Sequence, residues 1–564
     1  MESRLSRTTA EALRTAARIA CEEALAVAQA DEVDGCPDPR YTTINWPQAA
    51  LRIVHEVIAQ VAQAQYMRQH IAQLPPELLA LVFKPLYDSD RLSAVLTCRL
   101  WRDTLFGTPT LWTDVDFNKS RSSGALARYV SLSGNLPLET LDVLFTTASN
   151  VEACDVLAKN ISRTRRLSVR IDHQPATPED QHRLNLALSY PAPMLTMLRL
   201  YDYGGRWNND RDDDIHMFRN VAPMLSVLKI HCHIGALQGS AGALANVKQA
   251  LYSSSETLVA ETISQFVDLC PALEQLGVEV DEWENRLLDT PITLPAPLVE
   301  FNVVANQTEF EPAELLASFD LSAISRIWIS YNSGAFPADI NNTLALFLPP
   351  NLAPIRTLQM FGSTFADSTF NMRLLTDNLQ PHNPAAFNRR TIQRYILDAC
   401  IDAQMPAVKE LVQDVLTLYV GERIFYMDAL LNEATLPKVE TLVLCIMTPT
   451  SYASHGDCSI FFPVDENERR LPLNFPRLHN VVLAAREEGN NVKLDPALVL
   501  RFLQTYLVFD APRLPVLVLQ GVHLLEYSAQ DVAALLSYVD ELQVFAGPLE
   551  MNWTNSDLLH WGYF

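Results

Sequence analysis

The sequence predicts a mixed α/β chain: an all-α amino-terminal part, followed by an irregular solenoid with parallel strands on one face and helices on the other. Helical patterns fill most of residues 1–70, apart from a turn-rich break at 31–47. A short apolar segment over 71–117 predicts two or three further helices. Over residues 118–564 a phrase recurs in which apolar residues are spaced L-x-x-L-x-L. Many copies come after a helical run, and this alternation is typical of a solenoid.

The first two predicted helices are marked by a capping pattern and an apolar stripe. Thr8 and Glu11 fit a capping box before an alanine-rich helix over 8–30. A second helix over 48–73 has apolar residues three and four positions apart, which form one stripe. The stripe implies that this helix packs on a neighbour, either the next helical segment or the first repeat.

Residues 74–101, LPPELLALVFKPLYDSDRLSAVLTCRLW, are apolar and contain no pair of residues that could run a reaction. Pro75 and Pro76 suit the first turn of a helix, where a missing N–H costs nothing. Pro85 is predicted to end or kink that helix, and Asp88–Asp90 to supply a turn and N-cap for the next. The residues predicted to face inward on that next helix are Leu92, Val95, Leu96, Trp101 and either Leu100 or Cys98.

This segment is too small to bury its own apolar residues, because two or three helices in about 40 residues cannot enclose a full core. It is therefore either an ordinary helical hairpin inside a larger domain or a module that presents an apolar surface to a partner. The pattern alone leaves both interpretations open.

The recurring phrase starts with proline, any residue and leucine, and continues with alternating apolar positions, which predict a short strand. Its spacing is irregular: 30 residues separate Leu195 from Leu225 and 48 separate Leu225 from Leu273, whereas one leucine-rich unit takes about 20–29. Some units must hold insertions. A conventional α/β domain is the alternative, but no glycine-rich phosphate loop supports it. Copies of the phrase lie at 192–203, 222–233, 270–280, 475–485 and 511–521, with weaker ones at 295–305, 321–331, 352–362, 412–421 and 436–446.

Composition and charge exclude several classes of protein. With 564 residues and 48% apolar composition, the chain can form several domains or one extended array. Its 43 basic and 66 acidic residues give a net charge of −23, which is unsuited to nucleic acid or anionic lipid. The one basic cluster, Arg163, Arg165, Arg166 and Arg170, is interpreted as a solvated edge. The acidic balance favours a partner with a basic surface.

Cysteine usage and hydropathy indicate the compartment. Nine scattered cysteines without a C-x-x-C pair argue against a disulfide framework or structural zinc site. Reduced thiols place the chain in the cytosol or nucleus. The amino terminus lacks the apolar core of a signal peptide, and no apolar run reaches the ~20 residues that span a bilayer.

The sequence contains none of the common catalytic or phosphate-binding motifs, which predicts a protein that is not an enzyme and needs no cofactor. His231 and His233 would share one face of a strand, but two ligands do not make a metal site. The oxygens of Asn208–Asp214 lack the glycine and terminal glutamate of a calcium loop. An enzyme with an unrecognised site remains an alternative.

The segment over 71–117 closely resembles an F-box. Its continuation, with Pro109, Leu111 and Trp112, is similar to the segment directly after the F-box in many fungal F-box proteins. Those proteins commonly carry degenerate leucine-rich repeats like the phrases found here. The residues that carry the resemblance are Leu74, Pro75, Glu77, Leu78, Leu79, Val82, Phe83, Leu86, Asp90, Leu92, Cys98, Arg99, Trp101 and Arg102.

The resemblance implies the substrate-recognition subunit of a Skp–cullin–F-box ubiquitin ligase, with the F-box on the Skp adaptor and the repeats on a protein substrate. A non-catalytic leucine-rich scaffold that uses the F-box only for assembly is the alternative. Pro85 departs from the family pattern and would shorten the first helix, which implies weaker docking. By the family pattern, the residues that dock on the adaptor or support the fold of the F-box are Leu74, Pro75, Leu78, Val82, Phe83, Leu92, Cys98 and Trp101.

Overall fold

The computed structural model of the chain divides into two compact units. The first comprises Met1–Asp116 and Gly124–Glu139, and the second Phe117–Ser123 and Thr140–Phe564. The helices expected over 8–30 and 48–73 lie outside the residues that the structure describes. The described residues are 74–86, 88–116, 125–145, 150–171, 177–202, 216–237, 239–254, 257–284, 291–305, 312–331, 342–344, 346, 354–362, 369–376, 393–400, 413–421, 436–446, 472–485, 492–525 and 529–546.

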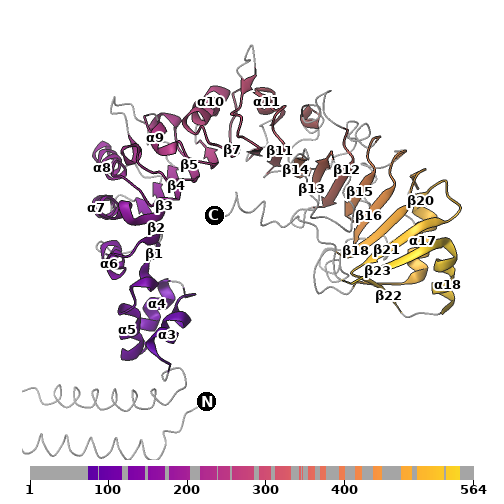
Figure 1. Cartoon of the computed structure of the whole chain (residues 1–564), viewed down its shortest axis with the longest axis horizontal. Helices are drawn as coiled ribbons and strands as arrows, with labels where there is room; N and C mark the ends of the chain where they lie inside the picture. The colour runs from indigo at the N-terminus through magenta and orange to yellow at the C-terminus, as the bar shows by residue number, and fades with distance from the viewer. Residues whose placement is uncertain are drawn as a thin grey trace, which may run out of the picture. The chain divides into compact units, whose positions relative to one another are not determined.

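The first unit is built mainly from short helices (Figure 1). The first described helix begins after Pro75 and ends at Phe83, close to Pro85 as expected, because a proline removes a helical hydrogen bond and clashes with the preceding turn. The next helix begins at Asp88, so the aspartates expected before it lie in its first turn instead. The elements are α3 (Pro76–Phe83), α4 (Asp88–Val95), α5 (Arg99–Phe106), η2 (Pro109–Trp112), β1 (Asp114–Asp116) and α6 (Ala125–Leu132).

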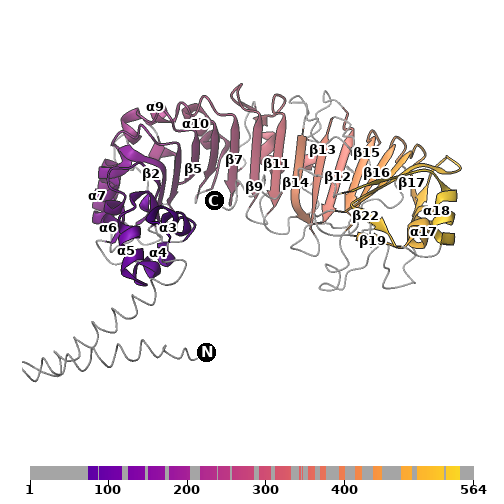
Figure 2. The same ribbon diagram turned by 60° about the horizontal axis from the view of Figure 1, so that its bottom comes forward.

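The second unit opens with a ladder of parallel strands, which Figure 2 shows side by side. Each strand pairs with the next one along the chain, in register and in the same direction. Helices α7 to α10 lie on the outer side of the curve that the strands make (Figure 1). The strands are β2 (Leu138–Phe145), β3 (Thr164–Ile171), β4 (Met197–Asp202), β5 (Val227–His231), β6 (Gln249–Ser253), β7 (Gln275–Val280), β9 (Glu300–Ala305) and β11 (Arg326–Tyr331), and the helices α7 (Asn150–Asn160), α8 (Pro178–Leu188), η4 (Met217–Asn220), η5 (Ile234–Leu237), α9 (Ala241–Leu244), α10 (Ala260–Leu269) and α11 (Pro312–Ala317).

Strand order then departs once from chain order. β14 pairs with β11, β13 is antiparallel to both β14 and β12, and β12 continues the parallel ladder through β15. The ladder is therefore parallel, as expected, except at β13. Its later strands and helices are β12 (Thr357–Gly362), β13 (Thr369–Leu375), β14 (Gln393–Cys400), β15 (Thr417–Gly421), β16 (Thr441–Ile446), β18 (Asn480–Ala485), β21 (Leu514–Gln520), β23 (Val539–Phe545), α17 (Pro496–Tyr506) and α18 (Ala529–Tyr538).

Three pairs of short parallel strands flank this sheet. Each pair joins segments from successive repeats, so it adds backbone hydrogen bonds between neighbouring units. The pairs are β8 (Ile292–Thr293) with β10 (Phe319–Asp320), β17 (Leu473–Asn474) with β20 (Leu507–Val508), and β19 (Val492–Leu494) with β22 (Val522–Leu524).

The recurring phrase forms one turn followed by one strand, and all ten of its copies end in a strand of the ladder. The leucine N–H donates to the carbonyl three residues earlier, at 3.1 Å in Leu195, Leu225 and Leu273. The side chains of these leucines are fully buried. A residue just after the turn then donates to the preceding repeat, as Thr196 does to the Arg165 carbonyl at 2.7 Å. The phrase therefore stabilises each turn and joins it to its neighbour.

The two faces of the strands differ between the halves of the ladder. In β3 to β7 most residues on the helix side are apolar and buried, and most on the open side are polar. In β15, β16 and β18 both faces are buried, and the sequence signal is an unbroken apolar run such as Thr441–Ile446. The cluster on the second face consists of Leu375, Tyr419, Val443, Cys445, Val482, Ala484 and Val518.

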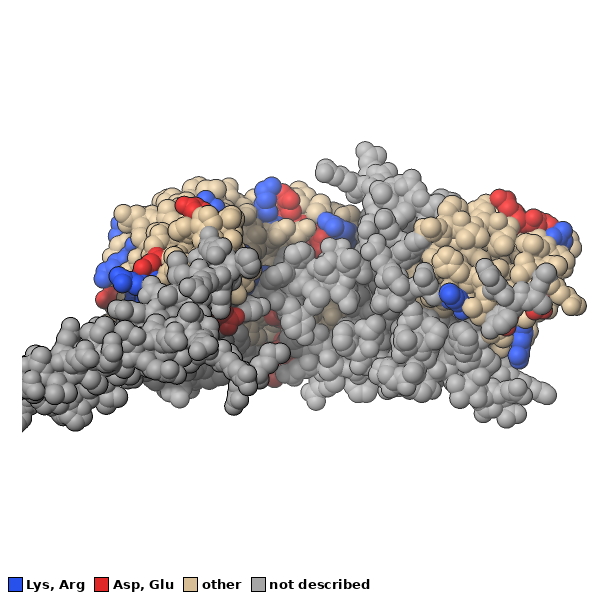
Figure 3. All heavy atoms as spheres, turned by 90° about the horizontal axis from the view of Figure 1, so that it is seen from below, with Lys and Arg blue, Asp and Glu red and all other residues tan. Residues whose placement is uncertain are grey.

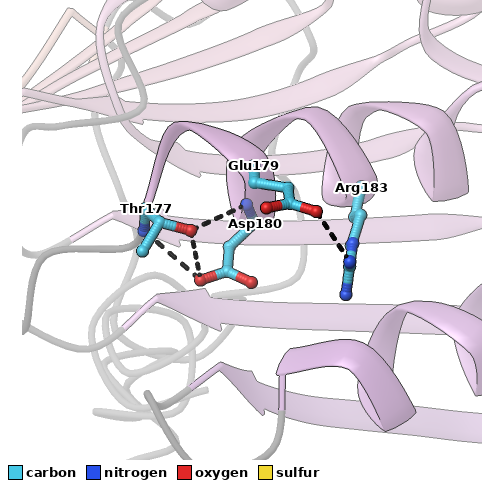
Figure 4. A network of polar contacts seen from close by, with 4 residues as sticks. All are labelled: Thr177, Glu179, Asp180 and Arg183. Atoms are coloured by element: carbon cyan, nitrogen blue, oxygen red, sulfur yellow. Dashed lines mark hydrogen bonds and ion pairs between the residues drawn. The ribbon is translucent and has the colours of Figure 1, made fainter.

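Helix α8 shows how local sequence sets an element boundary (Figure 4). Thr177 is its N-cap: the Thr177 hydroxyl accepts from the Asp180 N–H at 3.2 Å, and the Thr177 N–H donates back to the Asp180 carboxylate at 3.3 Å. One turn later, Arg183 pairs with Glu179 at 2.9 Å. This capping box satisfies N–H groups that the helix itself leaves without acceptors.

The surface carries charges of both signs. Figure 3 shows basic and acidic side chains interspersed on the visible face. Among the described helices, none is long and apolar enough to cross a membrane. In the described part of the chain, no group of three or more His, Cys, Asp or Glu side chains is arranged to hold a metal ion.

Candidate adaptor-docking surface

The core of the first unit is small and aromatic. Leu79 and Phe83 of α3 and Leu105 of α5 are buried. The rings of Phe83 and Trp101 meet edge to face with centroids 5.1 Å apart, a geometry that favours aromatic pairs beyond their buried area. Phe83 therefore holds α3 to α5 and has no exposed surface for a partner.

Arg91 of α4 joins the end of α3 to η2, a role that sequence reasoning missed. Its guanidinium donates to the carbonyls of Leu111 at 2.6 Å, Lys84 at 2.9 Å and Phe83 at 3.4 Å. Two of these carbonyls are at the end of α3, where a cation is favoured by the helix dipole. The side chain is 7% exposed. Sequence alone does not distinguish this arginine from one on the surface.

Two further contacts fix α5. The Trp112 indole N–H donates to the Leu105 carbonyl at 2.7 Å. Cys98 is the N-cap of α5, and its sulfur accepts from the Trp101 N–H at 3.5 Å. The partly buried Cys98 thus caps a helix, so the structure gives this predicted docking residue a supporting role.

Apolar side chains are exposed on the same helices. Leu78, Leu81 and Val82 share one face of α3 because they are three and four positions apart. Leu92 lies on α4, and Leu96 follows directly after its end. Scattered exposed leucines are common, but five exposed apolar side chains on and beside two short helices make this segment the candidate interaction surface. We call these five residues the apolar surface; their exposed fractions are 47% for Leu78, 63% for Leu81, 45% for Val82, 38% for Leu92 and 78% for Leu96.

The apolar surface differs from the face expected in the sequence. Leu92 and Leu96 were predicted to face inward, and both are exposed. The reason at Leu96 is that α4 ends at Val95, so the helical period does not extend to it. Leu81 and Leu96 were also absent from the predicted docking residues, although their exposure makes them the strongest additions to that set. Of the eight predicted docking residues, Pro75, Leu78, Val82 and Leu92 are exposed, Leu74, Cys98 and Trp101 are partly buried, and Phe83 is buried.

A second candidate surface is the open face of β3 to β7. Arg170 of β3 makes a two-pronged contact with Asp142 of β2, at 2.5 and 3.3 Å. Further along, His231 Nδ1 and Ser253 Oγ are 2.9 Å apart. This face carries charged and polar groups in register on successive strands, which suits recognition of a polar partner.

Burial shifts the proton affinity of the groups on this face. Lys229 is 3% exposed, and burial, together with the neighbouring Arg199 charge, lowers its pKa to about 8, with Glu279 opposing the shift. Burial raises the pKa of Glu279, against the effects of its hydrogen bond with Ser253 and of Lys229. Burial lowers the pKa of His231, and Asp281 and Asp202 oppose this. Anionic ligands would stabilise Lys229 in its charged form.

Comparisons with known proteins match the first unit to a family and the second to solved structures. Residues 71–118 match the family model described as F-box-like. No curated protein matches the sequence. A leucine-rich repeat-containing protein LegL7 from Legionella pneumophila is 12% identical, with a TM-score of 0.26, over 62% of this chain and 91% of that one. A structure of the Toll–Spatzle complex from Drosophila is 10% identical, with a TM-score of 0.28, over 73% of this chain and 54% of that one.

At these TM-scores the two solved structures carry no argument about the fold, so the strand pairing of this chain itself establishes the repeat architecture. That pairing shows successive turns and parallel strands with helices on the outer side. Residues 71–118 thus carry an F-box-like domain, and the chain beyond them forms a solenoid of the leucine-rich-repeat type.

Proposed function

We propose that this chain is the substrate-recognition subunit of a Skp–cullin–F-box ubiquitin ligase. Its F-box-like helices dock on the Skp adaptor, and its repeats bind a protein substrate. The observation that carries the proposal is the apolar surface, which lies within the F-box-like match. A partner that covers these side chains removes apolar area from water, which favours association.

The apolar surface is large enough to supply a binding hot spot. Full burial of a leucine or valine side chain contributes roughly 1.5–3 kcal/mol, and these side chains are about half exposed. Each therefore has about 1 kcal/mol left to gain, and a few such residues carry most of the energy of a typical interface. Docking through apolar contacts needs no catalytic residue, which suits a subunit whose role is to join the substrate to the ligase.

The repeats would hold the substrate near the ubiquitin-charged enzyme, so the rate would rise through proximity. In this proposal the chain itself is not an enzyme, and it works in the cytosol or nucleus. The free cysteines support a reducing compartment: Cys154, Cys232, Cys270 and Cys445 are buried as thiols.

The test is co-purification of the full chain with the Skp adaptor, beside a double change, Leu78→Ser with Leu96→Ser. Both side chains are exposed, so the variant should fold, and circular dichroism checks this. We expect the affinity to fall ~30-fold, since the two side chains together lose about 2 kcal/mol and each 1.4 kcal/mol is a factor of ten. The matched control is Leu186→Ser on α8, because Leu186 is 54% exposed but lies in the repeats.

Two outcomes would contradict the proposal. Failure of the intact chain to bind the adaptor would remove the docking role. Binding that brings in no cullin and supports no ubiquitin transfer in a reconstituted reaction would leave the non-catalytic scaffold as the function.

A further inference from the structure

The open face of β3, β4 and β5 forms a grid of nine residues, three from each strand. The register places Ser168, Arg199 and Lys229 in one row, and Arg170, Tyr201 and His231 in the next. We call the whole set the basic grid: Arg166, Ser168, Arg170, Met197, Arg199, Tyr201, Val227, Lys229 and His231.

The basic grid holds four cations and no acidic residue, in a chain whose net charge is −23. Arg166 is exposed, Arg170 and Arg199 are partly exposed, and Lys229 lies at the buried floor. On the β2 side, the carboxylate of Asp142 forms an ion pair with the Arg170 guanidinium. On the other side, the next strand contributes no charge to this face, which there consists of Gln249, Leu251 and Ser253. One strand further on, β7 carries Glu279 on this face. The grid itself is thus locally opposite in sign to the whole molecule.

We infer that the basic grid binds an acidic peptide segment of the substrate, so that the repeats select a partner rich in Asp and Glu on this part of their surface. The inference rests on the proposed function, because it takes the repeats to be the substrate-binding part. It reverses the expectation from net charge, which favoured a basic partner, because short-range complementarity depends on the residues at the interface.

The spacing of the cations favours a run of carboxylates over a single dianion. Neighbouring parallel strands lie about 4.8 Å apart, and residues two positions apart along a strand are about 6.6 Å apart. Arg166 and Arg170 are therefore ~13 Å apart, and the grid is about 10 Å wide. One phosphate cannot reach all four cations. An extended peptide places alternate side chains about 7 Å apart, which matches the grid.

One other feature of this face suits a peptide. Tyr201 and His231 lie in register at one edge of the grid and add polar contacts beside the cations.

The test is fluorescence anisotropy of the full chain with a labelled peptide in which glutamates alternate with serines. The same peptide with glutamines serves as the uncharged control. We expect the glutamate peptide to bind at least ~10-fold more tightly, with affinity falling as salt screens the charges. Arg166→Glu with Arg199→Glu should abolish this difference, whereas Arg501→Glu, on the exposed side of α17, should leave it unchanged.

The single change Arg166→Glu keeps the test valid if the double variant misfolds, because Arg166 is exposed. Adaptor co-purification separates the two proposals. The variants of the grid should still bind the adaptor, and the double variant Leu78→Ser with Leu96→Ser should still bind the acidic peptide. If the intact chain binds the peptide but does not bind the adaptor, the proposed ligase role is wrong and the grid remains a peptide-binding site.

Four results would overturn the inference. Equal binding of the glutamate and glutamine peptides, or no binding of either, would show that the grid does not select acidic segments. If a phosphoserine peptide binds and the glutamate peptide does not, the ligand of the grid is a phosphate group and not a run of carboxylates. If a single-stranded oligonucleotide displaces the peptide, the ligand of the grid is a nucleic acid and not a peptide. Peptide binding that appears only after Asp212–Asp214 are changed to Asn would make the chain's own acidic segment the occupant.

Discussion

Single residues hold the F-box-like helices in place, and Arg91 is the clearest case. Its guanidinium donates to the carbonyls of Phe83 and Lys84 at the end of α3 and to that of Leu111 in η2. Buried polar groups that lose their partners cost more than the hydrogen bonds contribute when present. The docking surface therefore depends on a residue that does not touch the proposed adaptor.

We expect Arg91→Met to destabilise the first unit by about 3 kcal/mol, because three backbone carbonyls lose a charged donor. Urea denaturation of the full chain, followed by tryptophan fluorescence, would measure this. Arg99→Met is the control: Arg99 is exposed and 3.8 Å from Asp103, so its loss should change stability by less than about 0.5 kcal/mol. Equal effects of the two changes would contradict the role given to Arg91.

The cap of α8 permits a second prediction at the same scale. We expect Thr177→Ala to destabilise α8 by about 1 kcal/mol, because an N-cap acceptor and half of the capping box are lost. Amide hydrogen exchange over residues 178–182 would report the change locally. Arg183→Ala removes only the exposed pair with Glu179 and should have a smaller effect, below about 0.5 kcal/mol. A larger effect of Arg183→Ala would show that the ion pair, and not the cap, stabilises this end.

At the scale of the elements, the ladder places a buried lysine between charged neighbours. On β5, Lys229 has Arg199 beside it and Glu279 two strands away. Its pKa is about 8 when folded, below the usual 10.5. Between these two values the unfolded chain binds a proton that the folded chain has released, so stability should rise with pH through this window.

We expect Lys229→Met to be more stable than the natural chain at pH 7, by about 2 kcal/mol, because an apolar side chain has no charge to desolvate. The difference should shrink as pH rises from about 8 to 10.5, since the natural lysine then loses its proton. Denaturant midpoints across this pH range would measure it. A difference that does not change with pH would mean that packing, not charge, sets the effect. The same titration should weaken acidic-peptide binding above pH 8.

The order of strands is the other feature decided at this scale. The turn phrase recurs with one buried Leu, Ile or Val at the turn of each copy, and the pairing of each turn with the preceding one builds the ladder step by step. β13 and β14 interrupt that order, and neither carries the phrase. An antiparallel strand needs only a short connection to its partner, which allows it to be inserted as a hairpin.

At the scale of the whole molecule, the chain combines two compact units with two different kinds of surface. The first unit exposes apolar side chains, and the second exposes a polar strand face with a basic part. Apolar contacts bind with little dependence on salt, whereas contacts between exposed charges weaken as salt screens them. We therefore expect adaptor binding and peptide binding to differ in salt dependence, which anisotropy and co-purification in parallel would show.

The sequence by itself determined the elements whose signal is local. The spaced apolar residues of each phrase, with a proline in most copies, predict a turn and a strand, and all ten copies have that structure. Pro85 predicted the end of α3 for the same reason, since its ring acts on its own helix. The resemblance of 71–117 to an F-box also lies in contiguous residues, and the match over 71–118 confirms it.

Only the tertiary structure decided which residues meet across distance. It placed Arg91 against the ends of α3 and η2, exposed Leu81 and Leu96, and turned Arg166 and Arg170 from an expected solvated edge into part of a strand face. It also placed β14 beside β11, across an interval of more than 60 residues. Strand order and side-chain exposure arise from pairing and burial between separate segments, and a periodic pattern in one segment carries no information about its partners.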